Sequence, residues 1–469
     1  MNFNNYSFFI FLFSVIVLYR FLPWKYGRIT LVLASYFFYG TANFYYCFLL
    51  LSSTLIDYFV AIQLSETENQ RHRKTLLFVS ILMNIGLLSF FKYSDFTIRN
   101  VNNLITGFGL SEISSLELIL PVGISFYTFQ TLSYTIDVYR KKTEVCHDFL
   151  TFALYVAYFP QLVAGPIERA SNLINQLKVK HKVEYDQFMH GIERILWGMA
   201  KKMIVADRLA VFVNEVYAQP NEMNSILLIL ACVGFMLQLY LDFSAYTDIA
   251  IGSARLMGVK LSENFNYPFA AVNVTEFWAR WHITLTSWFR DYVHRPLGGI
   301  KRSSLPKTFI NTLLVFTLIG LWHGAAWNFV FFGIYSGVCL GIHQALRLWG
   351  KDLFVFKWYN PPRWLGMILF GPIIYVGGIF FRSPDVETFT SFFVVISKLD
   401  LYIPSVYYTY TVLIFVILVA HWIRAEYLPL IRAGKIILNY NRLLSVMILL
   451  IALWLGAYDY KETFIYFQF

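Results

Sequence analysis

Apolar runs long enough to cross a bilayer recur along this 469-residue chain, and only 14% of its residues are charged. A soluble protein carries about 25% charged residues, so this chain has too little charge to cover its surface in water. A spanning helix needs about 20 mainly apolar residues. The sequence therefore predicts an all-α polytopic membrane protein, with about 10 to 12 spans and further re-entrant or interfacial helices. The candidate segments are residues 7–22, 29–45, 46–63, 75–91, 117–136, 149–166, 189–207, 224–243, 308–325, 328–348, 364–381, 407–424 and 443–459.

The positive charge of the chain, +10 overall, gathers in short loops between these runs. Basic clusters at 20–28, 71–74 and 140–142 are each separated by two candidate spans, so all three can face the cytoplasm, as the positive-inside rule requires. This orientation places the N-terminus outside and makes residues 7–22 a retained first span rather than a cleaved signal. No basic face with a nucleic-acid-binding motif is present, so no nucleic-acid partner is expected.

The middle of the chain, residues 244–307, contains no clean span and mixes Arg and Lys with Trp, Phe and Tyr. Such a composition predicts an amphipathic stretch at the cytoplasmic interface. Residues 159–169 carry two prolines and a glycine and predict a re-entrant turn, with Glu168 and Arg169 as a possible internal ion pair. Irregular backbone at membrane depth is tolerated only beside protein or a water-filled cavity. We therefore expect a central tunnel beside these segments.

Two histidines lie in this apolar setting: His282 within FWARWH and His323 within LIGLWHGAAW. An ionisable group at membrane depth is costly and indicates function. A buried imidazole stays neutral at pH 7 and can take a proton from a hydroxyl, and Gly320 and Gly324 would leave room for a substrate beside His323. The alternatives are a packing histidine at His323 and an interfacial histidine held by Arg280 and aromatic neighbours at His282.

Asp242 and Asp248 are six residues apart, so they do not share a helix face. They either have a structural role, pairing with buried arginines or capping a break in a helix, or they help to shape a substrate tunnel. Gly333, Gly337 and Gly341 form a small-residue ridge that predicts close packing of a neighbouring helix. The four cysteines are far apart and show no metal-site spacing, so no metal is expected.

Eight longer motifs stand out along the chain: LPVGISFYTF at 120–129, IDVYR at 136–140, AGP at 164–166, DFSAYTDIAIG at 242–252, NFNYPF at 264–269, EFWARWHITL at 276–285, GLWHG at 320–324 and FIYFQF at 464–469. Together they resemble the membrane-bound O-acyltransferase family. Within it, they are most similar to the bacterial branch of alginate O-acetyltransferases, peptidoglycan O-acetyltransferases and D-alanyl teichoic-acid transferases. Ala245 and residues 294–299 depart from the alginate pattern, so the acceptor polymer stays open.

The resemblance implies a single domain over 1–469, with N-terminal helices at 7–136, a catalytic core at 149–348 and C-terminal helices at 364–469. It implies that His323 is the family's essential histidine and that His282 is a second catalytic position. The expected substrate-binding residues are Trp278, Arg280, Trp281, Trp322, Asp242 and Asp248.

The expected activity is transfer of an acetyl group from a cytoplasmic donor, acetyl-CoA, towards hydroxyls of an extracytoplasmic polysaccharide, with an alginate-like polymer favoured. No bound cofactor is expected. An extracytoplasmic acetyltransferase or esterase-like protein would complete the transfer, and the chain would lie in a bacterial inner membrane. Peptidoglycan O-acetylation, D-alanyl transfer to teichoic acid, a non-catalytic acyl or polymer transporter and an assembly scaffold remain as alternatives.

Overall fold

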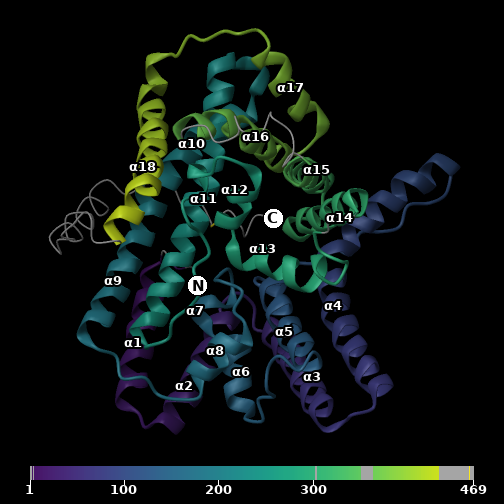
Figure 1. The fold of residues 1–469 in the computed structure, drawn as a ribbon, viewed down its shortest axis with the longest axis vertical. Helices are drawn as coiled ribbons and strands as arrows, with labels where there is room; N and C mark the ends of the chain where they lie inside the picture. Colours follow the sequence, from purple (N-terminus) through teal and green to yellow (C-terminus); the bar gives the residue numbers. More distant parts are fainter. Residues whose placement is uncertain (1–2, 4, 301–303, 350–362, 433–463, 465–469) are drawn as a thin grey trace. The chain divides into compact units, whose positions relative to one another are not determined.

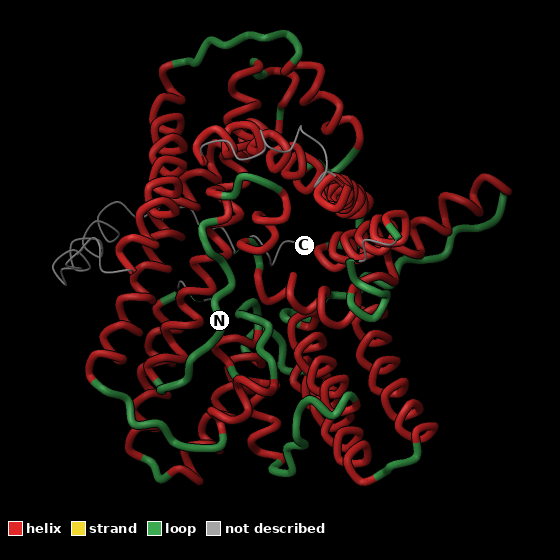
Figure 2. Tube along the Cα trace, in the orientation of Figure 1, coloured by secondary structure: helices red, strands yellow, loops and turns green. Residues whose placement is uncertain are grey.

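The computed structural model describes residues 3, 5–300, 304–349, 363–432 and 464. Every regular element in these residues is a helix, which confirms the all-α prediction (Figures 1 and 2). The chain divides into two compact units, Met1–Gly198 with Tyr246–Ser262 and Met199–Ala245 with Glu263–Phe469. The boundaries of these units differ from those of the three parts expected from the sequence. The long helix α11 (Ser225–Leu256), within the expected catalytic core, passes from the second unit into the first.

Seven helices in the described residues are long and apolar enough to cross a membrane, so the chain is a multi-pass membrane protein. The expected 10 to 12 spans also counted shorter segments, such as Tyr6–Phe21, and residues 443–459, which lie outside the described part. The seven are Tyr46–Glu66, Gln70–Phe108, Ser225–Leu256, Leu305–His323, Trp327–Leu348, Arg363–Arg382 and Ser405–Arg424.

The first unit packs its helices around α5 (Ile124–Tyr139), of which all but three residues are buried. Asp57 lies in its core with no exposed surface and accepts hydrogen bonds from Ser80, from Asn84 Nδ2 at 2.9 Å and from Thr135 Oγ1 at 3.1 Å. These polar groups satisfy one another inside apolar helices, which is how a buried carboxyl is tolerated. The other helices are α1 (Tyr6–Phe21), α2 (Trp24–Gly40), α3 (Tyr46–Glu66), α4 (Gln70–Ile105), η1 (Thr106–Phe108), α6 (Phe149–Ala157), α7 (Phe159–Leu162), α8 (Ala170–Leu177) and most of α9 (Tyr185–Ala200).

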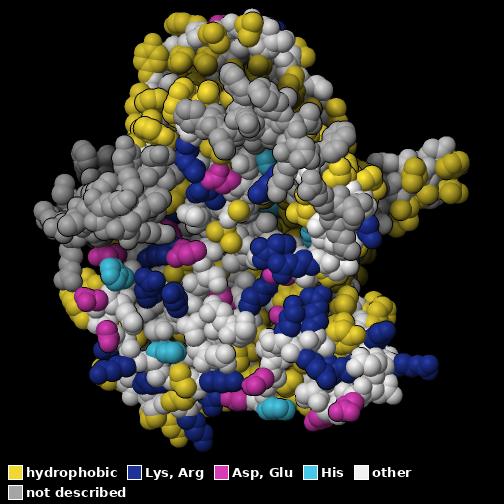
Figure 3. Space-filling model, viewed as in Figure 1, with side chains coloured by type: hydrophobic (Ala, Val, Ile, Leu, Met, Phe, Trp, Pro, Cys, Tyr) yellow, Lys and Arg dark blue, Asp and Glu magenta, His cyan; other side chains and the backbone are white. Residues whose placement is uncertain are grey.

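The second unit holds both singled-out histidines. It begins with a π-helix, η2 (Lys201–Ala206), and includes most of α11. Its α18 (Tyr408–Arg432) exposes more than half of Val412, Phe415 and Val416, and Figure 3 shows hydrophobic side chains covering the place where Figure 1 labels this helix. Its other elements are α10 (Asp207–Ala218), η3 (Pro220–Glu222), η4 (Pro268–Ala270), α12 (Val274–Arg280), α13 (Ile283–Phe289), η5 (Arg290–His294), α14 (Leu305–His323), α15 (Trp327–Trp349), α16 (Arg363–Arg382), α17 (Val386–Ile396) and η8 (Ser405–Tyr407).

Three sequence expectations need correction. Residues 149–166 are not one span, because the helix breaks at Tyr158 and restarts as α7 with a proline in its first turn. Residues 117–123 precede a helix that begins only at Ile124. Residues 244–256 continue α11 instead of opening the interfacial stretch, although 257–300 does consist of loops and short helices as expected.

Candidate active site

His323 is the last residue of α14 and is 6% exposed. Gly324, in an extended conformation, ends the helix, and α15 begins three residues later at Trp327. The two helices pack closely, because a Cβ added at Gly333 of α15 would collide with the backbone of α14. A Cβ at Gly337 would lie 3.0 Å from a Cα of α14, so the predicted small-residue ridge is confirmed.

The glycines that flank His323 serve helix packing. A Cβ at Gly320 would collide with the backbone oxygen of Phe329, and one at Gly324 would collide with the Phe329 ring. The expectation that these glycines leave room for a substrate is therefore wrong, because α15 fills that space. The room beside His323 lies elsewhere.

A cavity of about 40 Å³ borders His323. Helices α11, α12, α14, α15 and α16 contribute its walls, which are mostly aromatic and aliphatic. Two of the predicted substrate-binding residues, Trp278 and Trp281, line it, together with other apolar side chains such as Phe332, Phe370 and Phe381. The 264–299 stretch contributes one wall of this cavity, and a tunnel along that stretch stays a prediction.

His282 is 1% exposed and sits between α12 and α13 in a left-handed conformation, with φ of 39°. Its Nδ1 lies 3.0 Å from Oδ1 of Asn264, an oxygen that also accepts hydrogen bonds from the Thr284 hydroxyl at 2.9 Å and the Thr284 N–H at 3.3 Å. An amide oxygen can only accept, so His282 carries its proton on Nδ1 and Nε2 is the basic nitrogen. Burial lowers the pKa of His282 to about 3, which keeps the ring neutral at physiological pH.

The indole of Trp322 contacts both histidines. Its ring centroid lies 5.8 Å from that of His282 and 5.0 Å from that of His323. Phe243 packs edge-on against His282 at 4.8 Å, and Phe381 packs against His323 at 5.2 Å. The structure therefore brings the two catalytic candidates into one aromatic cluster of the second unit.

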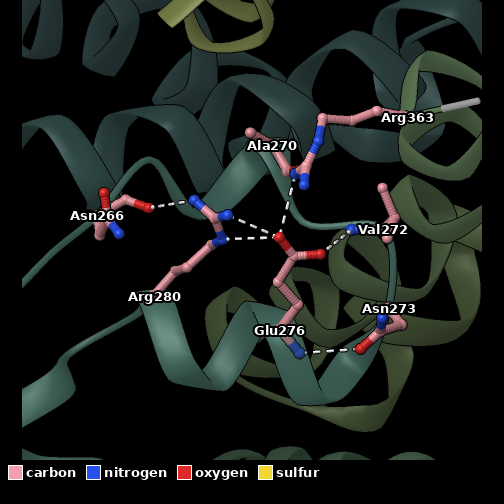
Figure 4. A network of polar contacts seen from close by, with 7 residues as sticks. All are labelled: Asn266, Ala270, Val272, Asn273, Glu276, Arg280 and Arg363. Carbon is pink, nitrogen blue, oxygen red and sulfur yellow. Dashed lines mark hydrogen bonds and ion pairs between the residues drawn. The ribbon is translucent and has the colours of Figure 1, made fainter. Parts of the chain in front are cut away.

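Arg280 does not hold His282 but belongs to a network around Glu276 (Figure 4). Its Nε and Nη2 donate to Glu276 Oε1 at 3.0 and 2.7 Å, and Arg363 Nη1 donates to the same oxygen at 3.1 Å. Burial alone would raise the pKa of Glu276, but the Val272 N–H and the two guanidinium groups outweigh it and lower the pKa. The network fixes α12, which carries Trp278, to the first residue of α16.

Asp242 and Asp248 both lie on α11, but they have different partners. Asp242 Oδ1 is 2.6 Å from Lys202 Nζ, and the same ammonium is 2.9 Å from Asp207 Oδ1. Burial opposes the charge on Lys202, yet the two carboxylates prevail and raise the pKa of the lysine. Asp248 pairs with Arg194 of α9 at 2.8 Å, within the first unit. Neither aspartate lines the cavity. Both instead form ion pairs with basic side chains, Asp242 with a lysine and Asp248 with an arginine.

Some residues of the site were not foreseen from the sequence. The sequence offers Asn264 only as part of a motif, although its side chain orients His282. Lys202 was overlooked, although the π-helix that carries it is a form often found at functional sites. Lys202 Nζ also lies 4.8 Å from the ring of Phe464, a buried residue of the C-terminal motif. The Glu168 carboxylate has partners beyond the expected Arg169, whose charge also acts on it. It accepts hydrogen bonds from Ser262 Oγ at 3.1 Å and from Asn172 Nδ2 at 2.6 Å.

Comparison with known proteins places this arrangement in a family. The membrane-bound O-acyltransferase family profile matches residues 141–383, which include both histidines and the cavity. The chain is 35% identical over 386 residues to a probable alginate O-acetylase of Pseudomonas aeruginosa, covering 82% of this chain and 72% of the relative. It is 33% identical over 388 residues to a peptidoglycan O-acetyltransferase of Helicobacter pylori, covering 77% and 72%.

A third relative, a teichoic acid D-alanyltransferase of Bacillus subtilis, is 33% identical over 261 residues, covering 53% of this chain and 64% of the relative. The similarity therefore extends over most of the chain in the two acetyl-transferring relatives and over about half of it in the third. This chain belongs to the membrane-bound O-acyltransferase family and is a multi-pass membrane O-acyltransferase.

Proposed function

We propose that this enzyme moves an acetyl group from acetyl-CoA at the cytoplasmic face towards hydroxyls of an extracytoplasmic polysaccharide, with an alginate-like exopolysaccharide as the acceptor. The observation that carries the proposal is the buried His323 beside a cavity, joined through the Trp322 ring to an oriented His282. The names of relatives in Pseudomonas and Azotobacter, at 33–35% identity, support alginate.

His323 acts as the general base in this proposal. Its neutral imidazole takes the proton of an attacking hydroxyl while the hydroxyl oxygen bonds to the thioester carbonyl carbon. The carbon–sulfur bond then breaks, and the thiolate leaves with the proton that the imidazolium returns. The products are an O-acetyl ester and free CoA, so atoms and charge balance. His282 holds a fixed tautomer beside Trp322 and positions the indole against His323.

The basic loops at 20–28, 71–74 and 140–142 favour a cytoplasmic face for the donor. We propose a bacterial inner membrane as the location, since the donor and a surface polymer lie on opposite sides of that bilayer. An extracytoplasmic acetyltransferase or esterase-like protein would receive the acyl group and complete its transfer to the polymer.

The direct test uses the purified full-length protein in liposomes, with acetyl-CoA labelled in its acetyl group, oligosaccharide acceptors and the extracytoplasmic partner protein. It follows both the release of free CoA and the label on the acceptor. His323→Ala should reduce acyl transfer at least 100-fold while the protein stays folded and inserted, because general-base catalysis contributes about 10²–10⁴-fold. His343→Ala is the matched control, since this histidine lies on α15 but does not line the cavity. Normal transfer by His323→Ala would remove His323 from the mechanism.

The acceptor is a separate question that the same assay answers. The Helicobacter pylori relative makes peptidoglycan the second candidate acceptor, and the Bacillus subtilis relative makes D-alanyl transfer the third possibility. Oligomannuronate, peptidoglycan fragments and lipoteichoic acid should therefore be compared, with D-alanyl thioesters as an additional donor. Preferential acetylation of peptidoglycan fragments would replace alginate in the proposal without affecting the role of His323.

A further inference from the structure

Side chains of α15 and α16 border the cavity beside His323. Ser336 on α15 and Ile374 and Gly377 on α16 line it, together with the Tyr335 ring. Ser336 is 5% exposed and Ile374 is 7% exposed, so neither belongs to the outer surface of the unit.

The size of the cavity matches a short acyl group. A single water needs roughly 10–15 Å³ of such space, so a cavity of about 40 Å³ has room for a small group rather than for a long chain. An acetyl group has two carbons and one oxygen, and propionyl and butyryl groups add one and two further carbons. The walls are mostly apolar, which suits a methyl group, and His323 supplies the basic nitrogen where the ester bond forms.

We propose that this cavity is the pocket for the acyl group during transfer, and that Ile374 and Gly377 limit its length to two carbons. The proposal rests on the proposed function, since it assigns a place for the acyl group of that reaction. It adds a preference for the length of the acyl group, which neither the histidines nor the family membership determines. One methylene in a closely fitting pocket changes the rate ratio between substrates by about 10- to 200-fold.

Ile374→Ala tests the proposal by widening the pocket. Purified full-length protein in liposomes is given acetyl-, propionyl- and butyryl-CoA, and kcat/KM is measured for each donor. The wild type should prefer acetyl-CoA over propionyl-CoA at least 10-fold, and Ile374→Ala should lower that ratio at least 10-fold by raising propionyl and butyryl transfer. Ile379→Ala is the matched control, because Ile379 is an isoleucine on the same helix, 3% exposed, that does not line the cavity.

Gly377→Ala provides a second variant that narrows the pocket without disturbing the fold. Its Cβ would lie 3.5 Å from the Tyr335 ring and 3.8 Å from the Phe332 ring, which are ordinary contacts. Alanine also suits a helix better than glycine. We expect the acetyl-to-propionyl ratio of kcat/KM to rise several-fold in this variant, which separates a steric effect from a general loss of activity.

Two results would overturn the proposal. One is an unchanged donor ratio in both cavity variants while acetyl transfer continues. The other is equal use of acetyl- and butyryl-CoA by the wild type, which would mean that longer chains leave the cavity past Ile373, a lining residue that is 40% exposed. Failure of the proposed function looks different, since the wild type would then transfer no acyl group from any CoA thioester.

Discussion

The Asn264→Ala substitution tests whether the orientation of His282 matters for acyl transfer. Asn264 has no exposed surface, and its Oδ1 accepts three hydrogen bonds, one from His282 and two from Thr284. Each such bond contributes about 1 kcal/mol net to stability. Alanine removes the acceptor and leaves the three donors buried, so the free energy of unfolding should fall by about 3 kcal/mol.

The expected effect on activity follows from the tautomer of His282. In apolar surroundings the bond to Asn264 is worth about 4–6 kcal/mol relative to no bond. This holds the proton on Nδ1 in all but roughly 0.1% of molecules or fewer, because 1.4 kcal/mol is a factor of ten. Without the bond, both tautomers are populated and the ring can turn. At metal-binding histidines, losing the partner that orients the ring costs about 10–100-fold in affinity or activity. By analogy we expect kcat to fall by about 10–100-fold, with the KM for acetyl-CoA within about threefold of wild type.

Asn264→Asp separates orientation from simple packing. A carboxylate keeps the acceptor in place but favours the imidazolium form, so it should raise the pKa of His282 from its value of about 3. Activity should then fall at low pH and recover as the pH rises, with an inflection at higher pH than in the wild type, where His282 stays neutral down to about pH 3. Asn266→Ala is the control, since the Asn266 side chain is exposed and only its backbone oxygen accepts the Arg280 contact. Folded Asn264→Ala protein with wild-type kcat would refute the two-histidine site.

Three further substitutions probe the second unit and the helix pair that carries His323. Lys202→Met should reduce the free energy of unfolding by about 3–5 kcal/mol, because it leaves two buried carboxylates without their cation; a melting temperature close to wild type would contradict this. Below pH 6.5 the unfolded chain takes up a proton at His282, whereas the folded chain does so only near pH 3. The free energy of unfolding of the wild type should therefore decrease as the pH falls through that range, by up to about 4–5 kcal/mol. In urea titrations, His282→Gln should make the free energy of unfolding less dependent on pH. Gly333→Ala should cost about 1–3 kcal/mol by forcing α14 and α15 apart, whereas Gly86→Ala, which meets open space, should be neutral or stabilising in the same melting experiment.

The sequence predicted those parts of the site that depend on local chemistry. The cost of a charge in hydrocarbon singled out His282 and His323, and the interfacial aromatic residues near them included Trp278 and Trp281, which line the cavity. Helix periodicity also predicted the glycine ridge of α15. These features depend on residue type and short spacing, which a single sequence displays.

Contacts between distant segments could not be predicted in this way. His282 and Asn264 are 18 positions apart, and Arg363 meets Glu276 across 87 positions. No spacing rule links such pairs, because loops set their geometry. The glycines beside His323 show the same limit. Glycine at these positions correctly predicts that another group lies close to the backbone, but the sequence does not reveal that this group is Phe329 and not a substrate.

Several charged residues of the second unit lie in ion pairs outside the cavity that borders His323. Arg280 and Arg363 share the Glu276 carboxylate, and Asp207 and Asp242 share the Lys202 ammonium, so these ion pairs hold helices and loops in place. The cavity itself is bordered by a histidine and mainly apolar walls. In an apolar cavity little water competes for the substrate. Each hydrogen bond to the attacked carbonyl oxygen therefore stabilises the transition state more than it would in water. The Glu276 network is therefore expected to act on the rate through the position of α12 and its Trp278. Loss of either set of ion pairs should lower the free energy of unfolding more than it lowers kcat.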